Sequence, residues 1–137
     1  MNSNIIPIFF ACDNGFVKYT MVSLKSLMMN ADRDRQYNIH ILNTGIDDDK
    51  KQVVLDMADD VFHIYFNDVT EYLKELEKRL PLRDYYSYTT YYRLFIPELY
   101  PEYDKAVYID SDTVCLSDIA ELYNTDMGDN LIAGIPD

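Results

Sequence analysis

The sequence predicts an α/β fold with a mostly parallel sheet and helices on both of its faces. Apolar runs of strand length alternate along the chain with segments of helical periodicity, which is typical of strand–helix–strand units. The chain has 137 residues, 48% of them hydrophobic, which is enough for one domain with a sizeable core. No linker, repeat or low-complexity tract divides it, so we expect one domain over residues 1–137.

The first predicted strand covers residues 5–12, an apolar run rich in Ile and Phe. A turn at Gly15 follows, and residues 18–30 then have the periodicity of a helix. The apolar face of this helix consists of Met21, Leu24, Leu27 and Met28. Residues 37–45, YNIHILNTG, predict a second strand that ends at Gly45.

The middle of the chain continues the alternation. Residues 47–59 predict a helix with acidic residues in its first turn, where the helix dipole favours them. Residues 61–66 predict a third strand, and residues 69–80 an amphipathic helix. The tyrosine-rich residues 85–101 predict a helix that Pro97 perturbs or ends. The residues at helical spacing in it are Tyr88, Tyr92, Phe95 and Leu99.

The last third of the chain supplies two more predicted strands. Residues 105–110, KAVYID, predict the fourth strand, and residues 131–135, LIAGI, predict the fifth. Between them, Ser117 or Asp118 can cap a short helix that runs through Tyr123.

Composition limits the partners and the compartment. Acidic residues outnumber basic ones, 24 to 12, for a net charge of −12, which argues against nucleic acid but not against a nucleotide held through a metal. Cys12 and Cys115 form no CxxC motif, so reduced thiols in a cytoplasmic protein are expected. We expect neither a membrane span nor a signal peptide. His40 and His63 lie inside predicted strands, and we assign them no role.

Two carboxylates follow the fourth predicted strand directly. In open parallel sheets, ligands bind beyond the carboxyl ends of the strands. If the backbone stays extended there, Asp110 and Asp112 point the same way, and their mutual repulsion is relieved by a divalent cation between them. Mg²⁺ or Mn²⁺ prefers such oxygen ligands and keeps positions for phosphate oxygens. The alternative is a polar turn in which one aspartate caps the loop.

A second polar cluster follows the first predicted strand. Asp13 and Asn14 end that strand, and the aromatic Phe16 comes next. Because the first strand of a parallel sheet is usually central, this cluster and the two aspartates can meet at one edge. A carboxylate beside an aromatic ring suits a nucleotide base, which it binds by hydrogen bonding and stacking. A simple turn leading into the helix is the alternative.

Three blocks of the chain resemble, in the same order, the N-terminal half of glycosyltransferase family 8. They are FFACDNGFVKYTMVSLKSL, YSYTTYYRLFIPELYP and DKAVYIDSDTVCLSDIAELYNTDMGDN. The family includes bacterial lipopolysaccharide galactosyl- and glucosyltransferases and glycogenin. The resemblance implies a Rossmann-like GT-A fold, a UDP-glucose or UDP-galactose donor, a glycan or lipopolysaccharide acceptor, Mn²⁺ (or Mg²⁺), and transfer with retention of the anomeric configuration.

The resemblance also implies roles for individual residues. Asp110 and Asp112 match the D-x-D motif that ligates the metal, and Ser111 between them matches a position beside the ribose. Ala11 and Asp13 match the stretch that recognises uracil, with Asn14 beside them. Phe16 matches an aromatic next to the uracil ring. Arg93 matches a basic position near the donor sugar and the first aspartate, although a surface salt bridge is the favoured explanation from the residues alone.

Part of the family pattern is expected beyond Asp137, the last residue of the sequence. It comprises a histidine that serves as the third metal ligand, the catalytic residues around the reacting carbon and most of the acceptor site. Residues 1–137 therefore look like the nucleotide-sugar-binding half without the acceptor-binding part. We assign no catalytic residue within them and expect this half to transfer no sugar by itself.

Two other functions start from the same residues. The stretch VYIDSDTV also resembles the first motif of haloacid dehalogenase-like phosphatases, in which Asp110 would be the nucleophile and Asp112 the general acid/base. That mechanism needs a later lysine, and no lysine follows Val114. The other alternative is a non-catalytic module that only binds a sugar nucleotide.

Overall fold

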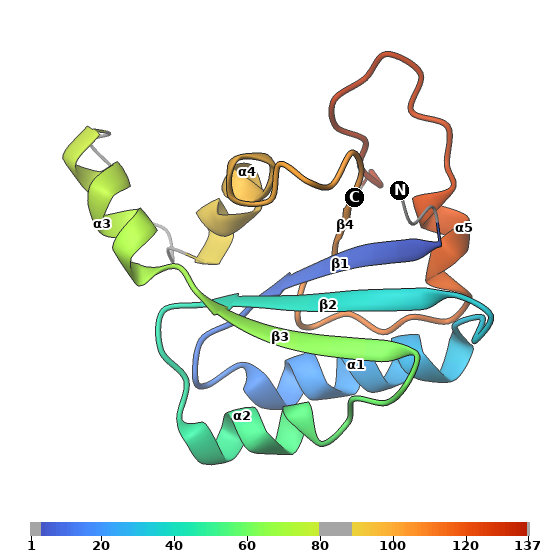
Figure 1. Cartoon of the computed structure of the whole chain (residues 1–137), viewed down its shortest axis with the longest axis horizontal. Coiled ribbons are helices and arrows are strands. Elements are labelled where there is room, and N and C mark those ends of the chain that lie inside the picture. The colour runs from blue at the N-terminus through green and yellow to red at the C-terminus, as the bar shows by residue number, and fades with distance from the viewer. Residues whose placement is uncertain (1–3, 80–88, 137) are drawn as a thin grey trace.

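The computed structural model describes residues 4–79 and 89–136 as an α/β domain (Figure 1). Its strands are β1 (Ile5–Ala11), β2 (Gln36–Asn43), β3 (Phe62–Asp68) and β4 (Val107–Tyr108). Its helices are α1 (Val17–Asn30), α2 (Asp48–Leu55), α3 (Thr70–Arg79), α4 (Thr89–Leu99) and α5 (Ile119–Tyr123). In the part of the chain described here, no helix is both long enough and apolar enough to cross a membrane.

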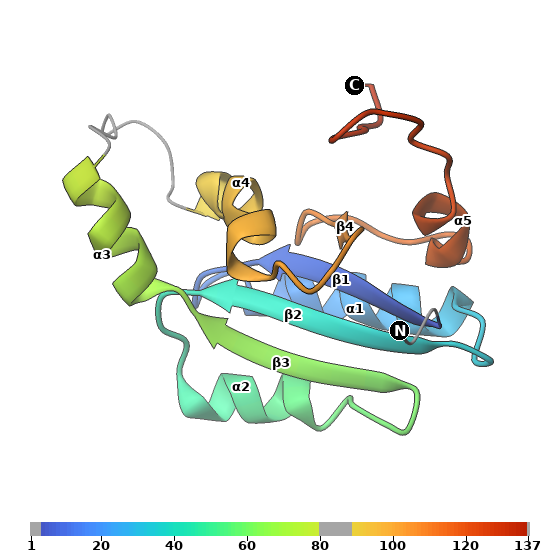
Figure 2. The same cartoon turned by 45° about the horizontal axis from the view of Figure 1, so that its top comes forward.

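The four strands form one sheet in the order β3-β2-β1-β4, and every neighbouring pair is parallel. The predicted α/β class and parallel sheet are therefore confirmed. The strand β1 is internal, with β2 on one side and β4 on the other. Parallel strands need long crossovers, and α1 and α2 provide two of them on the same face of the sheet (Figure 2). The helix α4 lies on the opposite face.

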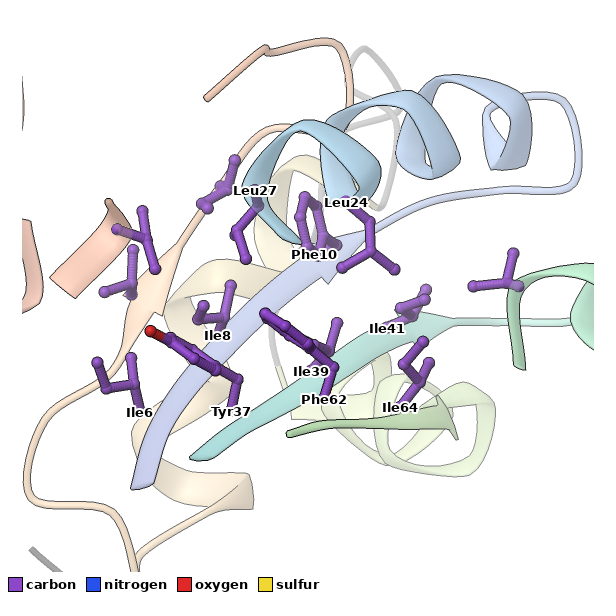
Figure 3. Close-up of a cluster of buried hydrophobic side chains, with 14 of the residues drawn as sticks. Ile6, Ile8, Phe10, Leu24, Leu27, Tyr37, Ile39, Ile41, Phe62 and Ile64 are labelled. Carbon is purple, nitrogen blue, oxygen red and sulfur yellow. The ribbon is translucent and has the colours of Figure 1, made fainter. Parts of the chain in front are cut away.

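The larger core lies between the sheet and the helices α1 and α2. Alternate residues of β1, namely Ile6, Ile8 and Phe10, point into it and are almost fully buried (Figure 3). Leu24 and Leu27 of α1 pack against them. The other labelled members are Tyr37, Ile39, Ile41, Phe62 and Ile64. Two of the four residues predicted for the apolar face of α1, Met21 and Met28, are only partly buried.

The second core lies on the other face of the sheet, and it explains why β1 is apolar along its whole length. Phe9 and Ala11, the intervening residues of β1, pack there with Leu42 of β2. Tyr92 and Ile96 of α4 cover them. A strand buried on both faces is expected to be continuously apolar rather than alternating. Packing against side chains on both of its faces therefore fixes β1 in the domain.

His40 is a packed core residue with a complete set of partners. Its Nδ1 lies 3.1 Å from Oδ1 of Asn67, and its Nε2 lies 2.9 Å from the Tyr103 hydroxyl. The Tyr103 hydroxyl also accepts a hydrogen bond from Asn38. It can therefore donate its own proton to His40 Nε2, while His40 Nδ1 donates to Asn67. This arrangement holds the imidazole neutral, stacked 4.7 Å from the Phe9 ring.

Two predicted elements differ from the structure. The fifth strand, residues 131–135, is wrong: this segment joins no strand of the described sheet, and Leu131, Ile132 and Ile135 are at least 80% exposed. A short apolar run becomes a strand only where a neighbouring strand supplies hydrogen bonds. The fourth strand, predicted over 105–110, is only the two residues of β4. The predicted helix over 85–101 falls partly outside the described residues, and its described part is α4, which contains Pro97.

We predict that neutral His40 makes the fold sensitive to acid. Burial lowers the pKa of His40 below its ordinary value, although the hydrogen bond to Asn67 and the charge of Glu102 oppose this. The unfolded chain, whose histidine pKa is about 6.5, therefore binds the proton first as the pH falls. This contribution to the free energy of unfolding is complete above that pH and is lost below it.

Urea unfolding at pH 7.5 and pH 5.5 measures the effect. The parent should lose more stability between these two pH values than His40→Gln, which keeps a donor and an acceptor but cannot titrate. The acidic residues that also titrate are the same in both proteins, so the difference between the two losses of stability is due to His40. An equal loss in the two proteins would show that His40 is not the sensitive group.

Candidate functional site

The carboxyl ends of β1 and β4 lie side by side, and two hydrogen bonds join them. The Ile109 amide donates to the Phe9 carbonyl at 2.9 Å. Two residues farther on, the buried Ser111 hydroxyl donates to the Ala11 carbonyl, also at 2.9 Å. The loop after β4 is thereby fixed to the end of β1, as expected from the parallel order of the strands. Asp110 and Asp112 are the residues directly before and after Ser111.

The chain turns at Ser111 and Asp112 instead of continuing as a strand. The turn is closed by Thr113, whose amide and hydroxyl both donate to the Asp110 carbonyl, at 3.3 and 2.8 Å. The condition of an extended backbone, under which the two aspartates point the same way, is therefore not met. Both carboxylates are exposed to solvent. The Asp112 carboxylate has no hydrogen-bond partner among residues 4–79 and 89–136.

Arg93 of α4 lies against the first aspartate. Its Nη2 is 3.1 Å from Oδ1 of Asp110, and its guanidinium carbon is 4.5 Å from the centre of the Tyr108 ring. The two charged side chains are 41% and 53% exposed, so this ion pair contributes at most about 1 kcal/mol to stability. Burial is the main cause that raises the pKa of Tyr108 to about 12, so its ring stays neutral beneath the cation. The structure thus brings Arg93 and Asp110 together at the same edge of the sheet.

The loop between β1 and α1 is organised by the carboxylate of Asp13. Its Oδ1 accepts hydrogen bonds from the amides of Gly15 and Phe16, at 2.9 and 3.0 Å. This is the turn that the sequence offered as the alternative to a role in base recognition. The end of this turn and the first turn of α1 present two aromatic rings to solvent: Phe16 is 46% exposed, Tyr19 is 45% exposed, and their centres are 5.4 Å apart.

Asn14 connects this loop to the start of α2. Its Nδ2 donates to Oδ2 of Asp47 at 2.8 Å, and its Oδ1 accepts from the Asp47 amide at 3.0 Å. Lys50 donates to the Asn14 carbonyl at 3.2 Å. Both ends of the Asn14 amide are thus engaged with the protein. This geometry gives Asn14 a supporting function in the loop.

Sequence reasoning missed several residues of this site. Tyr19, Tyr108 and Asp47 were not singled out, because their roles depend on contacts between distant segments. Ser26 and Asn30 of α1 were missed too: Ser26 accepts from the Cys115 amide at 2.9 Å, and Asn30 donates to the Cys115 carbonyl at 3.0 Å. The sequence feature that could have indicated Ser26 and Asn30 is a row of polar residues at helical spacing beside the apolar face of this helix.

The catalytic residues that the sequence led us to expect beyond Asp137 are not part of this site. Asp137 itself lies outside the described residues, which end at residue 136. We assign no catalytic role to the residues of the candidate site, and the expectation of catalytic residues farther along stays a prediction.

The residues present fit a divalent cation that is shared with a ligand. Asp110 and Asp112 supply exposed carboxylate oxygens, the donors that Mg²⁺ and Mn²⁺ prefer. Within residues 4–79 and 89–136 no group of three or more His, Cys, Asp or Glu side chains could hold a metal ion. The other coordination positions would therefore fall to ligand oxygens, water or further protein groups. Phosphate oxygens meet that need, and Arg93 can bind them as well.

Known proteins are similar to this chain over most of its length. Residues 7–137 match the model of the family described as glycosyl transferase family 8. A candidate glycosyltransferase of Haemophilus influenzae is 29% identical over 136 residues, which cover 98% of this chain and 40% of the relative. The lipopolysaccharide 1,3-galactosyltransferase of Salmonella typhimurium is 26% identical over 131 residues, 93% of this chain and 37% of the relative. The chain thus spans less than half the length of these relatives.

Solved structures share the fold. The bifunctional glycosyltransferase WbbM superposes with a TM-score of 0.79 at 29% identity, covering 94% of this chain and 22% of that one. The galactosyltransferase LgtC superposes with a TM-score of 0.69 at 27% identity, covering 91% of this chain and 44% of that one.

We predict that Ser111→Ala destabilises the domain by about 1–3 kcal/mol, because it leaves the Ala11 carbonyl without its buried donor. Ser117→Ala is the matched control: Ser117 is exposed on the same loop, and its loss should cost less than about 0.5 kcal/mol. Urea unfolding at pH 7.5 measures both. Equal small effects would mean that the Ser111 bond does not hold the loop to β1.

Proposed function

The chain belongs to glycosyltransferase family 8, and from that premise we propose that the whole protein transfers glucose or galactose from a UDP-sugar to a glycan acceptor, such as a lipopolysaccharide. The observation that carries the proposal is the carboxyl edge of the sheet, where Asp110, Asp112 and Arg93 lie on one side and Asp13 and Phe16 on the other. Carboxylates for a metal and an aromatic surface for a base are what a nucleoside diphosphate requires.

The loop after β1 would bind the uridine. Asp13 uses Oδ1 to hold its own turn, so Oδ2 is the oxygen left to accept a hydrogen bond from the imide N–H of uracil. The exposed ring of Phe16 offers a stacking surface beside it. Ala11 has a buried side chain at the end of β1, so its part in recognition would come from the backbone. Asn14 would act by holding the loop to Asp47.

The loop after β4 would bind the diphosphate. Asp110 and Asp112 would hold a Mn²⁺ or Mg²⁺ ion, which neutralises charge on the leaving diphosphate. Ser111 would lie beside the ribose, and its hydroxyl keeps the loop against β1. Arg93 would bind the donor at this end through its planar guanidinium, which the Tyr108 ring supports from below.

Retaining transfer passes through an oxocarbenium-like transition state, as glycoside hydrolysis does. Neutralisation of the diphosphate by the carboxylate-bound cation and Arg93 would lower its barrier. We assign no residue of this chain to the reacting carbon or to the acceptor. The expectations of a cytoplasmic location and of no transfer by residues 1–137 alone stay predictions.

The family match argues against the phosphatase alternative, because it extends over residues 7–137 and includes the stretch around Asp110. A module that binds a sugar nucleotide without transferring it uses the same residues. Release of UDP from UDP-glucose and UDP-galactose, with and without sugar acceptors, separates the module from the transferase. Stimulation of UDP release by an acceptor is the result that the transferase requires.

We predict that UDP binding depends on a divalent metal. Calorimetric titration with UDP in Mn²⁺ should give measurable affinity, and EDTA should abolish it, because the diphosphate would otherwise face two carboxylates directly. Asp110→Asn and Asp112→Asn should each weaken binding about tenfold or more, since each removes a charged ligand.

Asp126→Asn is the matched control, because Asp126 is an exposed carboxylate after α5. It should bind UDP as the parent does. Equal affinity with Mn²⁺ and with EDTA would contradict a bridging metal.

We predict that Asp13 selects uridine. The imide N–H of uracil is absent from cytosine, so UDP should bind more tightly than CDP at saturating Mn²⁺. Asp13→Asn should keep the turn, since an amide oxygen can still accept from Gly15 and Phe16, but it should lose the preference for UDP. Competition titrations with UDP, CDP and ADP measure this. If the parent binds UDP and CDP equally, Asp13 does not recognise the base.

A further inference from the structure

Thr113, the residue after the D-x-D stretch, connects the two aspartates to α1. Its hydroxyl donates to the Asp110 carbonyl at 2.8 Å and lies 3.2 Å from the Ser23 hydroxyl. Because Thr113 uses its only hydroxyl proton on Asp110, Ser23 must be the donor in the second bond. The bonds therefore run in one direction, from Ser23 to Thr113 to the Asp110 carbonyl.

Ser23, the first donor in this series of hydrogen bonds, lies in the interior of the domain. Its side chain is fully buried, and it belongs to the buried face of α1 together with Leu24 and Leu27. Thr113 in contrast is exposed, and its backbone amide is a long 3.3 Å from the Asp110 carbonyl. The turn that carries Asp110 and Asp112 is thus closed mainly by the Thr113 side chain.

The residues on either side of the turn are held as well. Before it, Ser111 is bound to the end of β1. After it, the backbone of Cys115 is bound on both sides by α1, with its amide to Ser26 and its carbonyl to Asn30. Asp112 lies between these anchors and has no hydrogen bond of its own to any described residue. Its direction is therefore set by its neighbours.

We propose that Thr113, held by Ser23, is a positioning residue that fixes the separation of the Asp110 and Asp112 carboxylates for one divalent cation. This inference rests on the proposed function, because it requires that the two aspartates bind a metal with UDP. A small cation such as Mg²⁺ needs its oxygen ligands at about 2.0–2.1 Å, so a turn that opens slightly would lose one ligand. Neither Thr113 nor Ser23 touches the cation, and both act through the backbone of the turn.

The test is Mn²⁺ titration in the presence of UDP, with free Mn²⁺ measured by electron paramagnetic resonance. Thr113→Val removes the hydroxyl at nearly constant shape and should weaken Mn²⁺ affinity about three- to tenfold, the effect of one hydrogen bond. Thr113→Ser restores the hydroxyl and should remain within about twofold of the parent. Ser23→Ala should weaken affinity in the same direction, and adding it to Thr113→Val should weaken affinity little further.

Thr125→Val is the matched control. The Thr125 hydroxyl donates to the Glu121 carbonyl at 3.4 Å beyond α5, away from the D-x-D turn along the chain. It can change stability, but it should leave Mn²⁺ affinity unchanged. Thermal unfolding of each variant identifies a temperature at which all are folded, and affinities are compared there. If Thr113→Val does not fold, the Mn²⁺ affinity of Ser23→Ala decides the test.

The outcomes separate this inference from the proposed function. If the parent binds Mn²⁺ and Thr113→Val binds it equally well, the positioning role is wrong and the metal site stands. If Thr113→Ser is as weak as Thr113→Val, the methyl group and not the hydroxyl is responsible, and the role is also wrong. If the parent binds no Mn²⁺ with UDP, both the metal site and the positioning role are overturned.

Discussion

The burial of β1 on both of its faces is the constraint on which the rest of the structure depends. Helices α1 and α2 cover one face of the sheet and α4 covers the other, while β1 pairs with β2 and β4 at its two edges. Pairing with β4 ends at Tyr108, and the Ile109 amide and the Ser111 hydroxyl continue the connection past the last ladder pair. The loops after the two strands therefore meet at one edge. The candidate site residues of these two loops owe their place to this register.

Beyond the ends of the strands, side chains provide the hydrogen-bond partners that backbone N–H and C=O groups find in neighbouring strands elsewhere. Residues 113–116 belong to no helix or strand, and Thr113 and α1 provide partners for this segment and for the turn before it. On the other side of the edge, Asp13 and Asn14 do the same for the loop after β1. Bonds of this kind fix a loop without covering it. The carboxylates can consequently be exposed to a ligand and still have defined positions.

Periodicity was enough to predict the parallel sheet, because apolar-rich runs of strand length alternate along the chain with segments of helical spacing. The same signal failed at 131–135, where the run is apolar but lies outside the sheet. It also could not decide for the turn at Ser111, which was offered only as an alternative, because side-chain hydrogen bonds with long sequence separations leave no period. Resemblance pointed to Arg93, which composition and spacing alone would have left as a surface charge. Its contacts with Asp110 and Tyr108 depend on how α4 packs over β1.

The pairing of Arg93 with Asp110 bears on how the edge can accept a cation. A divalent ion that binds Asp110 competes with the guanidinium for the same carboxylate. A buried ion pair would resist this exchange by several kcal/mol, but this pair is half exposed and its net strength is at most about 1 kcal/mol. The Tyr108 ring also holds the guanidinium from below, so Arg93 need not leave the site when it gives up Asp110. A diphosphate would arrive with the metal and offer Arg93 a replacement anion. The ion pair is therefore compatible with a metal at these aspartates: it keeps a cation beside Asp110 when no ligand is bound, and it leaves that cation available for phosphate when one is.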